Sequence, residues 1–153
     1  MRRNLGIAAL AVCMLVALAA AGPADQWAPA GAATKERVTK LKLKRSPYGR
    51  VLFANGYALY LFTRDQGPES KCYGECAEAW PPLEARGELK GGRGVKERLL
   101  GTTRRDDGSE QVTYRGHPLY HYVNDPRGEV FCQDVVEYGG TWYAVRKSGR
   151  PAP

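Results

Sequence analysis

The sequence lacks the motifs on which most familiar enzyme classes depend. It contains only 2 histidines among 153 residues, and neither a Ser-His-Asp arrangement with a nucleophile elbow nor a phosphate-binding loop is visible. The Cys-x-x-Cys-His motif of covalent haem attachment is also absent. His117 and His121 would stand about 13 Å apart on one strand, which is too far to share a metal ion. We therefore expect no catalytic residues and no cofactor, and we favour a protein that is not an enzyme.

The longest apolar run is at the N-terminus, where residues 5–21 follow two arginines and end in three alanines. This run is slightly shorter than the ~20 residues that cross a membrane. The pattern is typical of a secretory signal peptide, so residues 1–21 are predicted to be cleaved and the protein to be exported; a retained anchor is the alternative. Cys13 follows Val12, where a lipoprotein site needs a small residue, so we expect no lipid anchor.

Acidic residues are fewer than basic residues. The sequence has 16 Asp and Glu and 23 Lys and Arg, which gives a net charge of +7. The net charge becomes +5 once residues 1–21 are removed. We expect such an exported protein to attract an acidic envelope polymer, a membrane surface or another envelope protein. Nucleic acid is not expected as a partner, because the protein is predicted to be exported.

The mature chain has the length of one domain with a single core. Residues 22–36, rich in Ala, Pro and Gly, are predicted to be a flexible linker. Residues 37–147 are predicted to form a single two-repeat β domain, and residues 148–153 a frayed tail.

The domain is organised around a stretch that occurs twice, at a constant offset of 60 residues. The matching residues are Gly56 and Gly116, Leu59 and Leu119, Tyr60 and Tyr120, Phe62 and Tyr122, Asp65 and Asp125, and Cys72 and Cys132. Several identities at one offset indicate two copies of one supersecondary unit. The copies are predicted at about residues 48–83 and 108–145.

Alternation and turn residues predict a mainly β fold of antiparallel hairpins. In residues 39–44, leucines alternate with lysines, which predicts a half-buried strand with a basic outer stripe. We interpret the stripe as the solvated face of an edge strand, where lysines prevent aggregation; an anion site is the alternative. Asn55-Gly56 predicts a type I′ hairpin turn, and Arg115-Gly116 repeats it. Both faces of the strands that follow are apolar, so these hairpins are predicted to be central.

Two further hairpins are predicted, one around Asp107-Gly108 and one around Gly139-Gly140. Residues 84–98, rich in Gly, Arg and Lys, are predicted to be a long surface loop. Asp65 and Asp125 stand in turn contexts, where a carboxylate accepts backbone N–H groups. We prefer that structural role to acid–base catalysis.

Three cysteines remain after export: Cys72, Cys76 and Cys132. A spacing of four residues places Cys72, Cys76 and Trp80 on one face of a short helix. The two thiols would then be close enough to form a disulfide, which we interpret as a structural staple. A bridge to Cys132, a thiol-redox site, and a soft-metal site of the three thiols with His117 are alternatives.

Aromatic residues recur along the strands of both copies. They are Tyr57, Tyr60, Phe62, Tyr114, Tyr120 and Tyr122. Such stripes are mostly core, because aromatic side chains fit pleated surfaces. An aromatic surface for a glycan or peptide is the alternative, with Trp80 and Trp142 as its candidates.

The combined motifs resemble a bacterial family of secreted repeats, or predicted lipoproteins, with a Tyr-x4-Asp motif. The resemblance is carried by Gly56-x-x-Leu-Tyr-x-Phe-x-x-Asp, Ser70-x-Cys-x-Gly-x-Cys, Trp80-Pro-Pro-Leu and Gln111-Val-Thr-Tyr-x-Gly-His-Pro-Leu-Tyr. It covers about residues 38–145 and implies an exported, often lipid-anchored protein without an established activity. This chain departs from the family at Cys132, where a small residue is usual, and in its weak lipoprotein site.

The sequence therefore predicts an exported, non-enzymatic binding module of the envelope. The rival interpretation is a thiol-redox or metal-handling accessory protein that uses Cys72, Cys76 and Cys132.

Overall fold

A computed structural model describes residues 37–153 of the chain. The predicted signal peptide and linker, residues 1–36, lie outside the described residues. Within residues 37–153, no helix is long and apolar enough to cross a membrane.

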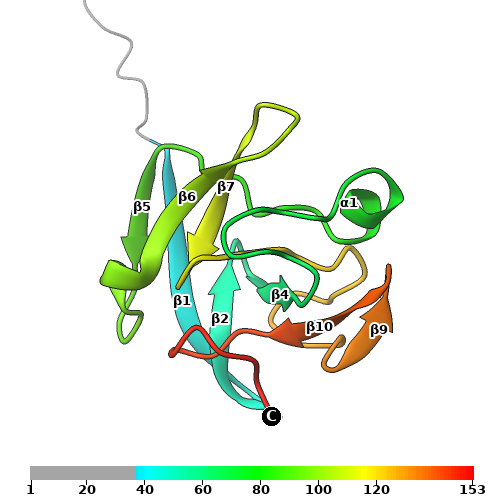
Figure 1. The fold of residues 1–153 in the computed structure, drawn as a ribbon. Coiled ribbons are helices and arrows are strands. Elements are labelled where there is room, and N and C mark those ends of the chain that lie inside the picture. The colour runs from blue at the N-terminus through cyan, green and yellow to red at the C-terminus, as the bar shows by residue number, and fades with distance from the viewer. Residues whose placement is uncertain (1–36) are drawn as a thin grey trace, which may run out of the picture. The chain divides into compact units, whose positions relative to one another are not determined.

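The regular structure of the described chain consists mainly of short strands that form three sheets (Figure 1). The first sheet has the order β3-β2-β1-β5, with β1 Val38–Ser46, β2 Gly49–Ala54, β3 Tyr57–Ala58 and β5 Glu88–Gly91. The second has the order β4-β10-β9, with β4 Tyr60–Phe62, β9 Val135–Glu137 and β10 Gly140–Ala144. The third has the order β6-β7-β8, with β6 Leu100–Arg104, β7 Glu110–Tyr114 and β8 His117–Pro118. The helices are α1 Glu75–Ala79 and the 3-10 helix η1 Glu97–Leu99.

The predicted turns of the two copies are confirmed. Asn55 and Gly56 have φ values of 54° and 93°, and Arg115 and Gly116 have values of 55° and 77°. Two successive positive φ angles are the requirement of a type I′ turn. The β2–β3 and β7–β8 hairpins are thus equivalent parts of the repeat.

Two hydrophobic clusters cover opposite faces of the central strands, as the two-sided apolar pattern predicts. The first contains Tyr60, Phe62 and Tyr120, together with Trp80 and Trp142. The second contains Leu59 and Leu119, among other aliphatic residues. Neighbouring residues of a strand point to opposite faces, so each copy contributes its tyrosine to one cluster and its leucine to the other.

The mainly β class with one short cysteine-bearing helix is confirmed, but the first sheet is not wholly antiparallel. Strand β5 pairs in parallel with β1 and lies within residues 84–98, for which a loop was predicted. Strand β1 therefore lies between β2 and β5 rather than at the sheet edge. The prediction of an edge strand is wrong.

Three local predictions also differ from the structure. Helix α1 begins at Glu75, because Gly74 has a φ of 55°, so Cys72 precedes the helix and Trp80 follows it. The last hairpin turns at Tyr138-Gly139, both with positive φ, one residue earlier than predicted. Residues 148–153 are not a frayed tail, since the Ala152 N–H donates to the Ala144 carbonyl at 2.8 Å.

Candidate functional site

The tyrosine and aspartate of the repeated motif pair across the two copies. The Tyr60 hydroxyl donates to Oδ2 of Asp125 at 2.6 Å, and the Tyr120 hydroxyl donates to Oδ2 of Asp65 at 2.9 Å. The second oxygen of each carboxylate accepts a backbone N–H six residues later, from Lys71 at 2.8 Å and from Phe131 at 3.2 Å. Each aspartate therefore has the turn role that its sequence context predicts. Each also accepts a hydrogen bond from the tyrosine of the other copy.

The environment of these pairs opposes ionisation. Burial is the main reason why the pKa of Asp65 rises from 3.8 to about 6, and burial likewise raises the pKa of Asp125. The pKa values of Tyr60 and Tyr120 are also raised, chiefly by burial. Each phenol therefore stays protonated and donates a hydrogen bond to its carboxylate. Both carboxylates hold fixed structural hydrogen bonds, which does not favour acid–base catalysis at this position.

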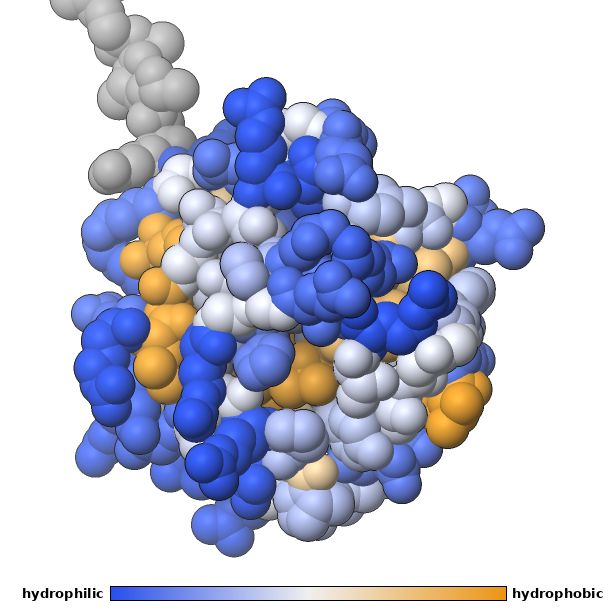
Figure 2. All heavy atoms as spheres, in the orientation of Figure 1, coloured by the Kyte–Doolittle hydropathy of each residue, from blue (hydrophilic) through white to orange (hydrophobic). Residues whose placement is uncertain are grey.

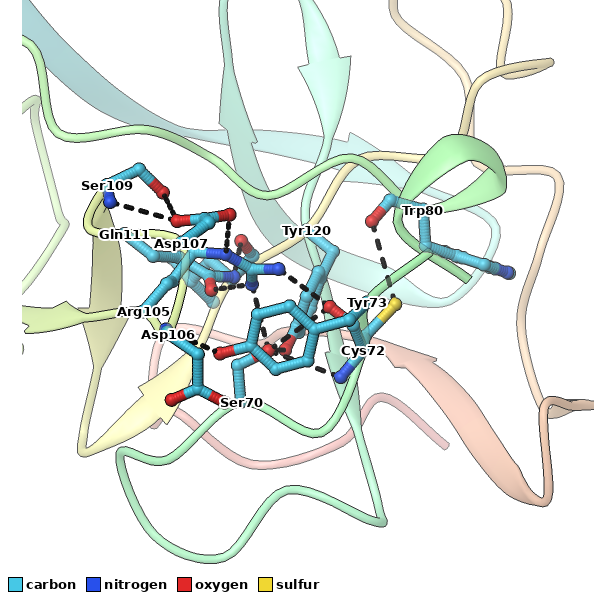
Figure 3. Close-up of polar contacts among 11 residues, drawn as sticks. Ser70, Cys72, Tyr73, Trp80, Arg105, Asp106, Asp107, Ser109, Gln111 and Tyr120 are labelled. Carbon is cyan, nitrogen blue, oxygen red and sulfur yellow. Dashed lines mark hydrogen bonds and ion pairs between the residues drawn. The ribbon is translucent and has the colours of Figure 1, made fainter. Parts of the chain in front are cut away.

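A buried arginine joins the Tyr120 side of this arrangement (Figure 3). Arg105 is 3% exposed, and its guanidinium donates to Ser70 Oγ, to Gln111 Oε1 and to the Cys72 carbonyl at 2.8, 2.6 and 2.7 Å. Ser70 Oγ lies 2.8 Å from the Tyr120 hydroxyl. A buried cation is tolerated only when its donors are satisfied, and here several acceptors surround it.

Sequence reasoning missed Arg105, although a comparison of the copies contains a signal. The polar partners Ser70 and Gln111 stand where the other copy has Val130 and Val51, at the offset of 60. A polar residue that replaces an apolar one at a core position of a repeat indicates a buried partner. The network therefore exists on one side of the repeat only.

The staple predicted between Cys72 and Cys76 is present, with the two Cα atoms 5.2 Å apart. Cys132 is a free thiol with an exposed fraction of 8%. The residue equivalent to Cys76 in the second copy is Val136, which is 75% exposed. Burial raises the pKa of the Cys132 thiol to about 11, so it is protonated at neutral pH and a poor metal ligand.

The alternative soft-metal site is not formed. Within residues 37–153, no group of three or more His, Cys, Asp or Glu side chains is placed to hold a metal ion. Two of the three candidate thiols are joined to each other, and His117 lies on β8. His121, predicted to be too distant to share a metal with His117, instead has Nδ1 3.1 Å from the Ala58 carbonyl oxygen.

The alternative of an aromatic surface is wrong, because its candidates Trp80 and Trp142 are both 0% exposed. Their rings stack on each other, with centroids 4.0 Å apart and planes 4° from parallel. The tryptophans lie in the core, together with most of the aromatic stripe. On the face drawn in Figure 2, hydrophobic residues form small separate patches among hydrophilic ones.

The basic stripe of β1 lines a groove of about 690 Å³. Lys40, Lys42 and Lys44 are exposed on one face of the strand, about 6.6 Å apart along it because a strand rises 3.3 Å per residue. Arg127 adds a fourth cation, and no lining residue is acidic. The remaining lining residues are Val38, Leu43, Phe53, Ala54, Asn55 and Gly56.

Both copies contribute to this groove. The Gly128 N–H donates to the Gly56 carbonyl at 2.8 Å, which joins the loop of the second copy to the turn of the first. Lys44 donates to the Gly128 carbonyl at 2.8 Å and lies over the Phe53 ring. Arg127 lies over the Tyr57 ring with its guanidinium carbon 5.1 Å from the centroid. The cations Lys44 and Arg127 are therefore held in place before any ligand binds.

The other two lysines are unpaired. Within the described residues, the ammonium groups of Lys40 and Lys42 have no hydrogen-bond or ion-pair partner. Unpaired like charges on one face repel each other by a small amount in water. Such an arrangement is most favourable when an external anion lies between them.

The fold itself does not require this stripe. In β1, Lys42 and Lys44 are paired with Phe53 and Val51 of β2. At the equivalent register of the second copy, β6 has Gly101 and Thr103, which pair with Thr113 and Gln111 of β7. The same hairpin is thus built without the lysines.

Comparison with known proteins identifies a family but no activity or ligand. A family described as a secreted repeat of unknown function matches residues 43–84 and 101–146. The chain belongs to this secreted-repeat family. No curated protein and no solved structure matches it. The two matched segments of the secreted repeat contain both copies of the Tyr-x4-Asp motif, which confirms the predicted resemblance.

Proposed function

We propose that this secreted repeat is a binding module that holds a linear acidic polymer of the cell envelope in the groove along β1. The observation that carries the proposal is the row of three lysines, joined by Arg127, in a groove without an acidic residue. A cleft lined by one sign of charge concentrates ligands of the opposite sign.

The shape of the site favours a chain over a flat surface. The lysines stand at regular intervals along one strand, so successive anionic groups of an extended polymer can each meet one ammonium group. Phe53 and Ala54 line the groove beside them and offer contact to the uncharged backbone of a polymer. A bilayer surface would meet the rim of the groove and leave its interior unfilled.

The test compares two charge-matched double variants of the full exported protein. Lys40→Gln/Lys42→Gln removes two groove cations that have no partner within residues 37–153, whereas Arg98→Gln/Lys147→Gln removes two exposed cations that do not line the groove. Binding of a fluorescent oligogalacturonate, a linear polycarboxylate, is measured by anisotropy at several salt concentrations.

We expect the groove variant to lose about tenfold or more in affinity, because a lysine near an anionic surface contributes about 1 kcal/mol. The slope of log K against log salt should also decrease by about 2, one for each lost contact. The control variant should lose less than about threefold. Equal losses in both variants would mean that net charge, not the groove, attracts the polymer, and no binding by the parent protein would reject the proposal.

A further inference from the structure

Six aromatic side chains in the core form one continuous array. Phe62, Trp142 and Trp80 stack in that order, with successive centroids 4.0 Å apart. Tyr122 follows Trp80 at 4.6 Å, with its ring tilted by 36°. Tyr60 meets Trp80 edge-on at 5.2 Å, and Tyr120 meets Trp142 edge-on at 5.1 Å. The two copies thus contribute equivalent rings on either side of the tryptophan pair.

The two ends of the stack differ. Tyr122 is partly exposed, whereas Phe62 at the other end is 2% exposed. A phenol ring gives up an electron far more readily than the phenyl ring of Phe. The end of the array that solvent reaches is therefore the end that can take part in electron transfer.

The two tryptophans also differ. Trp80 Nε1 donates to the Glu137 carboxylate at 3.0 Å, whereas the buried Nε1 of Trp142 has no acceptor among residues 37–153. A carboxylate at hydrogen-bonding distance stabilises positive charge on an indole ring. An electron is therefore more easily removed from Trp80 than from Trp142.

The two tyrosine–aspartate pairs differ in the same direction. Oxidation of a phenol releases its proton, so it needs a base within reach. Tyr60 has Asp125 at 2.6 Å, with Val130 in the position equivalent to Ser70. Tyr120 has Asp65 at 2.9 Å, but its hydroxyl also contacts Ser70, which accepts from the Arg105 cation. That nearby positive charge opposes the loss of an electron from Tyr120.

We propose that Tyr122, Trp80, Tyr60 and Asp125 form a one-electron relay that takes up an oxidising equivalent at the surface and holds it on Tyr60. An external one-electron oxidant, such as a small inorganic radical, takes one electron from Trp80 across the Tyr122 ring and is reduced to its anion. Tyr60 then gives one electron to the Trp80 radical cation and its hydroxyl proton to Oδ2 of Asp125. Trp80 returns to its neutral form, Tyr60 becomes a neutral phenoxyl radical, and Asp125 becomes a neutral acid.

This arrangement protects the radical from solvent, because Tyr60 is 0% exposed. The spin is then on Tyr60 and the released proton is on Asp125, within one hydrogen bond of the oxygen that it left. The relay does not use the groove along β1, so it stands independently of the proposed binding function.

The test is pulse radiolysis of the full exported protein with azide radicals, which oxidise tryptophan. Transient absorption follows the indolyl radical and the tyrosyl radical in the same sample. We expect the tyrosyl signal to grow as the indolyl signal decays, at a rate that does not depend on protein concentration. A rate proportional to protein concentration would place the transfer between molecules and overturn the relay.

Matched variants locate the radical. Tyr60→Phe should abolish this transfer phase and Asp125→Asn, which keeps the shape of the side chain, should abolish or slow it at least tenfold. Tyr120→Phe, the same change in the other copy, should retain it, as should Tyr138→Phe at a position outside the array. Native circular dichroism of each variant verifies the fold.

Three results would overturn the assignment. They are retention of the phase in both Tyr60→Phe and Asp125→Asn, its loss in Tyr120→Phe, and its loss in Cys132→Ser. The last would identify the nearby thiol as the group that holds the radical, because the Cys132 N–H lies 3.5 Å from the Tyr60 hydroxyl oxygen.

Discussion

Tyr60 and Tyr120 exchange both of their backbone hydrogen bonds, with N–H to carbonyl distances of 2.9 and 3.0 Å. The two copies of the motif therefore meet in antiparallel orientation at their tyrosines. From this junction each side chain crosses to the aspartate of the other copy. One copy alone would leave both its hydroxyl and its carboxylate without their partners.

The first prediction concerns this crossing. Tyr60→Phe removes the donor to a buried carboxylate that is 5% exposed, and the free energy of unfolding should fall by about 1–3 kcal/mol. Urea denaturation followed by circular dichroism measures the change. Tyr138→Phe, at a side chain that is 39% exposed, is the control and should change stability by less than about 0.5 kcal/mol. Equal effects would mean that the Tyr60–Asp125 bond contributes no stability.

The second prediction concerns pH. Asp65 has a pKa of about 6 in the folded protein against 3.8 for the ordinary group, so the folded state binds this proton more tightly than the unfolded chain. The contribution of Asp65 to stability is therefore complete below about pH 4 and is lost as pH rises through about 6. The slope is at most about 1.4 kcal/mol per pH unit.

Asp65→Asn, which cannot titrate, isolates this contribution. The difference in the free energy of unfolding between the parent and Asp65→Asn should move in favour of Asn as pH rises from about 4 to about 7. Urea titrations of both proteins at several pH values measure it. A difference that stays constant over this range would show that the carboxyl does not titrate there.

The third prediction concerns Arg105. Arg105→Met removes the buried donors to Ser70 Oγ, Gln111 Oε1 and the Cys72 carbonyl, and stability should fall by about 3 kcal/mol or more. Arg104→Met changes the neighbouring arginine, which is exposed, and should cost less than about 0.5 kcal/mol. Thermal unfolding of both variants compares them. A stable Arg105→Met protein would mean that the apolar side chain compensates for the lost bonds.

The fourth prediction separates a staple from a redox site. Cys72→Ser/Cys76→Ser opens a loop of only a few residues, so stability should fall by about 2 kcal/mol while oligogalacturonate binding at a folding temperature stays unchanged. Cys132→Ser, which breaks no disulfide, is the control for loss of a sulfur atom and should cost less. Unchanged stability together with reversible reduction of the parent disulfide by a mild dithiol would favour the thiol-redox interpretation.

The sequence by itself determined the repeat, its hairpins and the staple, because these depend on contacts between residues close in the chain. Asn55-Gly56 specifies its turn through φ angles that few other residue pairs adopt. The alternation of leucine and lysine specifies which face of β1 is buried. The spacing of Cys72 and Cys76 brings the two sulfur atoms together even though the helix is shorter than predicted.

Only the tertiary structure decided what these elements do together. Strand β1 became an interior strand because β5, from a segment without strand periodicity, pairs with it. Trp80 and Trp142 became core residues because the two copies bring them together at a centroid distance of 4.0 Å. The groove required Arg127, more than 80 residues after Lys44, to reach the same place. Such long-range contacts depend on how the copies pack, and no local pattern of residues specifies that packing.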